Sequence, residues 1–168
     1  MKWCTIKKEY IDFMKKEEPR IPNIEYGSNS LKPFFSPLFK VGNLVYVTQV
    51  SSAKDRHNFI KEDKDFVKLY DGSKLVSVVN LNYMFPVPEE LIIEITYKNI
   101  DNFRTFTSDI EKNNYIVLLK KEKRELKIKC IDKKAQYLYA HRYTFPNARV
   151  SLRCFDFKKL EEVAKKYK

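Results

Sequence analysis

The sequence predicts a single α+β domain over residues 1–168, with a mostly antiparallel β-sheet first and helices packed on it afterwards. Two observations favour this fold class. Short β-prone segments alternate with turn signals up to residue 98, whereas residues 99–143 contain no proline or glycine and have the Lys-, Glu- and Leu-rich composition of helices. In addition, 43% of the residues are apolar, which is enough for one core in a chain of this size.

The first part of the chain begins with a short strand over residues 3–6. Residues 8–18 follow with apolar side chains at helical spacing, which predicts an amphipathic helix that ends before Pro19. Residues 19–32 are expected to form an extended surface loop. The apolar or alternating runs after this loop predict further strands at 33–41, 44–50, 65–70, 75–81 and 91–97.

Turn residues and prolines separate these strands. Glycine-containing turns at 42–43 and 71–72 are expected to close two hairpins. Residues 51–58 are polar and are expected to leave the sheet where a strand ends. Proline is confined to sheet edges, strand ends and bulges, so an edge position or a bulge is expected at Pro33 and Pro37, and an interruption is expected at Pro86 and Pro88.

The second part of the chain is expected to be helical. Residues 99–143 predict two helices with a break somewhere within 123–133, although the alternation of residues 126–130 suits a strand equally well. A last helix is expected over 156–167, with Asp156 as its N-cap.

Charge is the outlying property of the composition. The chain has 33 Lys and Arg against 22 Asp and Glu, a formal net charge of +11, and 14% of its residues are aromatic. This combination favours a polyanionic partner, because basic side chains neutralise phosphates and aromatic rings stack on bases. A solvated, lysine-covered surface is the alternative. The apolar and aromatic content excludes intrinsic disorder, and three glycines make a glycine-rich phosphate loop unexpected.

Metal and membrane signals are absent from the sequence. Cys4, Cys130 and Cys154 are widely spaced without a CxxC pair, and only His57 and His141 could join them, so neither a metal site nor a cofactor is expected. The charged N-terminus has no apolar leader, and no run approaches the roughly 18 apolar residues of a membrane span. We therefore expect reduced thiols in a soluble, cytoplasmic protein that has no membrane contact.

Residues 51–54, Ser-Ser-Ala-Lys, carry the most distinctive chemistry. Two hydroxyls and an ammonium group leave a strand end together, a cluster that can bind a phosphate through hydrogen bonds and compensating charge. The cluster also suits RNA cleavage in which the substrate's own 2′-OH is the nucleophile. That reaction needs positioning, charge stabilisation and proton transfer, but no metal. The alternative is an ordinary polar loop.

Other segments are candidates for RNA binding. Aromatic residues near Lys32 form an aromatic–basic mixture of the kind that holds single strands, although Phe34 and Phe35 suit a buried sheet equally well. The lysine-rich run 120–134 predicts either an RNA-binding face or the solvated side of two helices. The candidate RNA-binding residues are Tyr26, Arg56, Lys120, Lys121, Lys123, Arg124, Lys127, Lys133 and Lys134.

Five segments of the chain, taken in order, carry the pattern of one family. Residues 3–15 combine a strand ending in Thr-Ile with a helix containing Tyr-Ile, and residues 32–35 read Lys-Pro-Phe-Phe. Residues 50–58 contain Ser-Ser-Ala-Lys and end in His-Asn, and residues 79–87 read Val-Asn-Leu-Asn-Tyr-Met-Phe-Pro-Val. Residues 154–162 begin a closing helix. Together they resemble the ToxN/AbiQ/CptN toxins of type III toxin–antitoxin systems over the whole length of the chain.

This resemblance implies a strongly twisted, mostly antiparallel sheet with a Kid/MazF-like barrel core and packed helices. It implies a metal-independent endoribonuclease that cuts A-rich single-stranded RNA, including cellular mRNA, to 2′,3′-cyclic phosphate ends. The partner implied is a repetitive RNA antitoxin, which the toxin processes into pseudoknot units and which inhibits it in a closed protein–RNA hetero-oligomer. Phage defence is the biological setting of such systems.

The family's functional residues correspond to Ser51, Ser52, Lys54 and Lys32, with Ala53 in place of the usual proline. We expect the two lysines to neutralise the scissile phosphate, Ser52 to bind a non-bridging oxygen or orient the 2′-OH, and Ser51 to support it. His57 is the acid/base candidate, because it is the only nearby side chain with an unperturbed pKa close to neutrality. The alternative is a non-catalytic RNA-binding module in which residues 51–54 seat a backbone phosphate.

Overall fold

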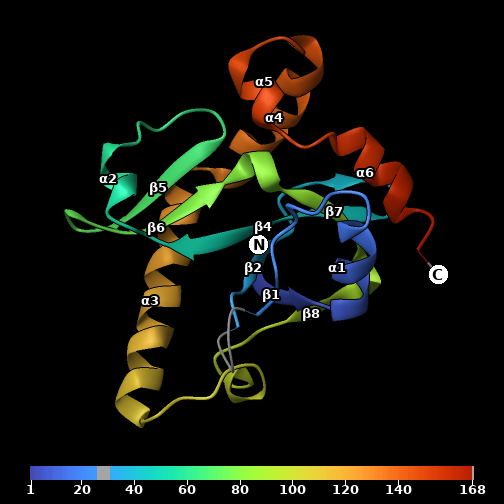
Figure 1. The fold of residues 1–168 in the computed structure, drawn as a ribbon. Helices are drawn as coiled ribbons and strands as arrows, with labels where there is room; N and C mark the ends of the chain where they lie inside the picture. The colour runs from blue at the N-terminus through green and yellow to red at the C-terminus, as the bar shows by residue number, and fades with distance from the viewer. Residues whose placement is uncertain (26–30, 168) are drawn as a thin grey trace.

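A computed structural model describes residues 1–25 and 31–167 (Figure 1). In this part of the chain, eight strands form one antiparallel sheet: β1 (Lys2–Ile6), β2 (Phe34–Ser36), β3 (Lys40–Val41), β4 (Leu44–Ser52), β5 (Phe66–Asp71), β6 (Lys74–Asn80), β7 (Phe85–Pro88) and β8 (Ile92–Glu94). The helices are α1 (Lys8–Lys15), α2 (Arg56–Phe59), α3 (Asp109–Ile128), α4 (Ile131–Thr144), α5 (Arg149–Arg153) and α6 (Phe157–Ala164). Single 3₁₀ turns lie at Leu81–Tyr83, Glu89–Leu91 and Ile100–Asn102. The predicted α+β class is confirmed.

The long strand β4 organises the sheet, which runs in the order β5-β6-β4-β2-β1-β8 (Figure 1). Its first residues, 44–47, pair with β3 and β7, whereas residues 48–49 pair with β2 and residues 50–52 pair with β6. The two ends of β4 therefore belong to different parts of the sheet. The serine-containing end lies between the β5–β6 hairpin and the start of β2.

The beginning of β4 is fixed by an aromatic cluster. Tyr46 is fully buried, stacks on Phe39 at 4.4 Å between ring centroids, and donates a hydrogen bond of 2.7 Å to the Glu161 carboxylate of α6. Tyr139 of α4 donates to the same carboxylate oxygen at 2.9 Å. The helices α4 and α6 therefore pack against the first half of β4. The second half of β4, which ends in the two serines, is not covered by this cluster.

Two strand predictions need correction at β4 and β2. The strand continues to Ser52 rather than ending at Val50, and the polar segment after it contains the short helix α2. The strand β2 is not at an edge, because it pairs with both β1 and β4. Its three residues lie between Pro33 and Pro37, so neither proline has to join the ladder.

The prolines expected to interrupt the sheet lie inside a strand. Residues 85–88 form β7, which pairs with β4 alone among the described strands, so its other edge has no ladder in which a missing N–H would matter. The carbonyl of Pro86 instead accepts a hydrogen bond of 2.7 Å from the Tyr10 hydroxyl of α1. The expected strand over 91–97 is reduced to the three residues of β8.

The predicted turns and helices agree more closely with the structure. Gly42 and Gly72 both have positive φ, 59° and 61°, in the two expected hairpins. Two helices with a break at Lys129 and Cys130 replace the strand alternative, since residues 126–128 are helical. Asp156 caps α6 by accepting from the Lys159 N–H, as expected.

The helix boundaries differ in three places. The helix α1 ends at Lys15 rather than at residue 18. The long helix α3 begins at Asp109 rather than near 99, because the Ser108 hydroxyl caps it by accepting from the Glu111 N–H. The short helix α5 was not expected. None of the described helices is both long and apolar enough to cross a bilayer.

Candidate active site

The two adjacent serines point into different cavities. Successive side chains of a strand face opposite sides of the sheet, and Ser51 and Ser52 are the last two residues of β4. Ser52 lines a cavity of about 90 Å³ beneath α3, whereas Ser51 lines a separate cavity of about 210 Å³ together with Arg20 and Gln49. The expectation that both hydroxyls act at one point is therefore not how the described residues are arranged.

The cavity beside Ser52 gathers polar side chains from distant segments. Its polar lining consists of Lys32 before β2, Ser52 of β4, Arg104 before α3, and Tyr115 and Glu122 of α3. Apolar side chains such as Leu118 close the rest of it. The segment before β2 supplies the lysine, β4 supplies the hydroxyl, and the long helix α3 supplies Tyr115 and Glu122.

Lys32 and Lys54 are close enough to influence each other. Partial burial lowers the pKa of Lys32 below its usual value, and the positive charge of Lys54 lowers it further. The main chain of Lys32 is held in place, since its N–H donates to the Ile24 carbonyl at 3.0 Å and its carbonyl accepts from Gln49 Nε2 at 3.3 Å. Lys32 lines the cavity beside Ser52, whereas Lys54 is not among the lining residues and acts on Lys32 through its charge. Two like charges close to each other favour binding of an anion.

Glu122 lines the candidate site but was not predicted from the sequence. Its side chain is only 5% exposed and lies on the buried face of α3 with Leu119 and Leu126. Burial raises the pKa of the Glu122 carboxyl to about 7, and a hydrogen bond from the Ser77 hydroxyl partly offsets this rise. The signal that could have found it is a glutamate at the spacing of an otherwise apolar helix face.

Arg104 and Tyr115 also line this cavity and were not singled out from the sequence. The Arg104 guanidinium lies 4.3 Å from the centroid of the Tyr115 ring, a cation–π contact. One of its terminal nitrogens is 3.7 Å from Glu111, and its Nε atom is buried with no hydrogen-bond partner among the described residues. No local sequence pattern predicts that these two residues belong to the site, because only the folded chain brings the segment before α3 and α3 itself to the end of β4.

His57 has a different environment from the one expected. It is 7% exposed in α2, and its Nδ1 accepts a hydrogen bond of 3.0 Å from the Lys54 N–H. Burial lowers the pKa of His57, and the charges of Arg56, Lys54 and Lys68 lower it further. Within the described residues, His57 is not part of the lining that holds Lys32 and Ser52. Tyr26 lies outside the described residues.

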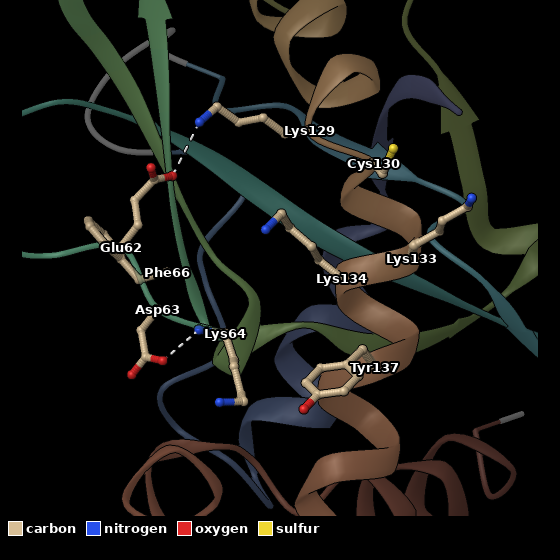
Figure 2. A pocket seen from close by; sticks show the side chains of 9 residues that line it. All are labelled: Glu62, Asp63, Lys64, Phe66, Lys129, Cys130, Lys133, Lys134 and Tyr137. Carbon is tan, nitrogen blue, oxygen red and sulfur yellow. Dashed lines mark hydrogen bonds and ion pairs between the residues drawn. The ribbon is translucent and has the colours of Figure 1, made fainter.

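A larger groove of about 680 Å³ lies between α4 and the segment before β5 (Figure 2). Lys134 and Tyr137 of α4 face the residues of that segment, whereas Lys133 points away from it (Figure 2). Lys129 at the start of the groove forms an ion pair of 3.3 Å with Glu62. Lys133 and Lys134 were singled out from the sequence as RNA-binding candidates, whereas Lys129 belongs to the same lysine-rich run but was not singled out.

The predicted basic residues of α3 do not line this groove. Lys120 lies 5.1 Å from the centroid of the Tyr97 ring, and Lys121 forms an ion pair of 2.5 Å with Asp71 of β5. The described structure thus divides the lysine-rich run between two helices. The exposed or half-exposed basic residues of α3 are Lys112, Lys120, Lys121, Lys123, Arg124 and Lys127.

Comparison with known proteins shows the family of this chain. The sequence profile described as "Toxin ToxN, type III toxin-antitoxin system" matches residues 2–165. An endoribonuclease ToxN from Bacillus thuringiensis subsp. kurstaki is 28% identical over 176 aligned positions, which cover 99% of this chain and 84% of that protein. An endoribonuclease ToxN from Pectobacterium atrosepticum is 26% identical over 107 positions, covering 61% of this chain and 63% of that protein.

Solved structures share the fold over nearly the full length. A structure described as showing selective toxin inhibition by a non-coding RNA pseudoknot in type III systems has a TM-score of 0.74 and 25% identity, covering 99% of this chain and 96% of that chain. AbiQ, a lactococcal anti-phage endoribonuclease, has a TM-score of 0.76 and 16% identity over 98% of this chain and 95% of its own. A third, described as a bacterial antiviral system regulated by a processed non-coding RNA, has a TM-score of 0.78 and 20% identity over 99% of both chains. Because the family profile spans nearly all of the sequence, the chain belongs to the ToxN toxin family of type III toxin–antitoxin systems.

Proposed function

We propose that this endoribonuclease toxin cuts A-rich single-stranded RNA without a metal ion, using the 2′-OH beside the scissile phosphate as the nucleophile. The products are a 2′,3′-cyclic phosphate and a 5′-OH. The observation that carries the proposal is the cavity at the end of β4 that holds Lys32 and Ser52 together. Lys54 follows Ser52 by two residues outside the lining of this cavity, and after burial its charge is the second cause that lowers the pKa of Lys32. Both lysines then oppose the negative charge of the bound phosphate.

The lysines act mainly in the transition state. As O2′ attacks, the phosphate becomes a dianionic, phosphorane-like species, and its extra charge is stabilised by ammonium groups that are already in place. Partial burial of Lys32 strengthens this effect, because a charge pair interacts more strongly where water is excluded. The Ser52 hydroxyl donates to a non-bridging oxygen or orients the 2′-OH.

Ser51 and His57 have supporting roles. The hydrogen bond from the Lys54 N–H to His57 Nδ1 fixes the turn that carries Lys54, so we assign His57 to positioning of this lysine in place of proton transfer. Ser51 faces the opposite side of β4 and supports the strand from there. Catalysis by the remaining residues therefore requires one hydroxyl rather than two.

The inhibitor is an RNA antitoxin made of repeats that fold as pseudoknots and close a ring with several copies of the toxin. The net charge of +11 supports a large phosphate-contacting surface through counterion release. The groove between α4 and the segment before β5 is suited to a strand of this RNA, since Lys134 supplies charge and Tyr137 supplies a ring for stacking (Figure 2).

Paired measurements on Lys54→Ala and on a Lys133→Ala/Lys134→Ala double variant test the proposal. Lys54→Ala should lower single-turnover cleavage by on the order of 10²-fold or more, while antitoxin affinity changes little, because one phosphate contact among many alters the log–log salt slope by about one unit. The double variant should weaken antitoxin binding and spare cleavage of a short RNA. Lys166→Ala, an exposed lysine near the C-terminus, is the matched control.

Two outcomes would contradict the assignment. If Lys54→Ala cuts at the wild-type rate, the end of β4 is not the active site. If Lys54→Ala loses binding and cleavage in parallel, residues 51–54 merely seat a backbone phosphate, as in a non-catalytic RNA-binding module.

A further inference from the structure

We propose that Glu122 is the general acid of this cleavage, giving the proton of its neutral carboxyl to the 5′-oxygen as the bond between phosphorus and that oxygen breaks. The inference rests on the proposed function, because it assigns the proton donor of the same reaction.

The neighbouring strands β4 and β6 hold the Glu122 carboxyl close to Ser52, which is proposed to bind the reacting phosphate. Glu122, Lys32 and Ser52 line one cavity of about 90 Å³. The Ser77 hydroxyl of β6 donates to Oε1 of Glu122, and Ser77 is the Cα partner of Ser52 in the β4–β6 ladder. Directly opposite side chains of paired strands start only about 5 Å apart. The carboxyl is thus held one strand away from the hydroxyl that is to bind the phosphate.

The surroundings of Glu122 keep a proton on it near neutral pH. The charged and titratable groups that share its cavity are Lys32, Arg104 and Tyr115. Burial raises the pKa of Tyr115, the charge of Arg104 opposes this rise, and the charge of Glu122 adds to it. On the β5 side, Asp71 is paired with Lys121, the residue before Glu122. Burial dominates over these neighbours and raises the pKa of Glu122 to about 7.

Substrate binding strengthens this preference. A phosphodiester anion entering the cavity adds a negative charge, which favours the neutral form of a nearby carboxyl. The hydrogen bond from Ser77 engages Oε1, so we assign the proton of the neutral carboxyl to Oε2. In the bound complex Glu122 is therefore a donor, as a general acid must be.

The reaction balances without a metal or another reagent. The bond between O2′ and phosphorus forms, and the proton of the 2′-OH passes to solvent water. The bond between phosphorus and O5′ breaks, its electron pair stays on O5′, and Oε2–H of Glu122 supplies the proton that completes the 5′-OH. The carboxylate then regains a proton from water, while Lys32 and Lys54 offset the charge on phosphorus-bound oxygens.

The test uses the full chain and two RNA oligonucleotides that differ in one atom. One carries the normal 5′-oxygen at the cleavage position, and the other carries a 5′-bridging sulfur, a leaving group that needs no proton. Glu122→Gln should cut the oxygen substrate on the order of 10²-fold or more slowly than wild type, but the sulfur substrate within a few-fold. Glu125→Gln, the same substitution on the same helix outside the cavity, should cut both at wild-type rates.

A second measurement needs no variant. For the wild-type chain, the ratio of oxygen-substrate to sulfur-substrate cleavage rates should fall about tenfold per pH unit above the carboxyl pKa, because only the oxygen substrate requires the acid. Taking the ratio cancels the pH dependence of the 2′-OH, which both substrates share.

Two results would overturn the inference without touching the proposed function. In one, Glu122→Gln slows both substrates equally, which indicates a structural role under α3. In the other, the rate ratio of the wild-type chain does not change with pH. The proposed function itself fails by a different result, namely wild-type cleavage that leaves no 2′,3′-cyclic phosphate.

Discussion

Replacing Glu122 with glutamine should stabilise the protein at alkaline pH and alter its stability little in acid. Glu122 is 5% exposed, and burial raises the pKa of its carboxyl from 4.5 to about 7 in the folded protein. Because the folded state holds the proton more tightly, ionisation of Glu122 costs stability as pH rises from 4.5 towards 7 and beyond. Glutamine retains an acceptor for the Ser77 hydroxyl but cannot ionise.

The magnitude follows from the two pKa values. The interval between 4.5 and about 7, at about 1.4 kcal/mol for each pH unit, corresponds to about 3 kcal/mol above pH 7. Below pH 4.5 the carboxyl is protonated in both the folded and the unfolded state, so the contribution of ionisation disappears there. The free energy of unfolding of Glu122→Gln relative to wild type should therefore rise with pH over this window and level off near pH 8.

Urea denaturation of both chains at half-unit pH steps measures this difference, and other titrating groups cancel in the comparison. Glu125→Gln on the same helix serves as the matched control and should show a difference that does not vary with pH. A difference between Glu122→Gln and wild type that stays constant from pH 4 to pH 8 would refute the reasoning, because it would mean that Glu122 ionises in the folded protein as it does in the unfolded chain.

Three further predictions concern the site and its supports. Ser52→Ala should lower cleavage on the order of tenfold or more, whereas Ser51→Ala, whose side chain faces another cavity, should change single-turnover rates by only a few-fold. His57→Asn, which keeps an acceptor for the Lys54 N–H, should retain most activity, while His57→Ala should not; equal loss in both variants would mean that the imidazole transfers a proton. Arg153→Ala should lower the free energy of unfolding by on the order of 3 kcal/mol, because it leaves the buried Asp65 carboxylate without its two hydrogen bonds from Arg153. Urea denaturation measures this loss, and an unchanged transition midpoint would contradict the prediction.

The local parts of the fold could be predicted because their causes are local. Glycine at positive φ closes both hairpins, and Asp156 and the break near Cys130 mark helix boundaries from a few neighbouring residues. The strand predictions were wrong where pairing with a distant strand determines the local structure. Nothing in residues 85–88 reveals that β7 pairs along only one edge within the described residues, and nothing in residues 51–52 reveals that β6 extends the pairing of β4 to Ser52.

Only the candidate site residues on and next to the sheet could be predicted from the sequence. Lys32, Ser52 and Lys54 belong to motifs that can be compared with a known family, and their roles in the site stay a prediction. Glu122 and Arg104 come from segments that lie at least 50 residues further along the chain than Ser52 and meet it only after α3 docks on the sheet. In a helix rich in Lys and Glu, a single buried glutamate looks like its solvated neighbours until the apolar face of the helix is known.

Cleavage of a defined A-rich RNA by the purified chain in excess chelator, with the chemical ends of the products determined, tests the central claim most directly. The account predicts an unchanged rate in EDTA, products that end in 2′,3′-cyclic phosphate, and no cleavage of an otherwise identical RNA that carries a 2′-deoxy sugar at the cleavage position, because the attacking oxygen belongs to the substrate. Activity that disappears in EDTA and returns with Mg²⁺, or normal cutting of the 2′-deoxy substrate, would contradict it, since an activated water would then be the nucleophile.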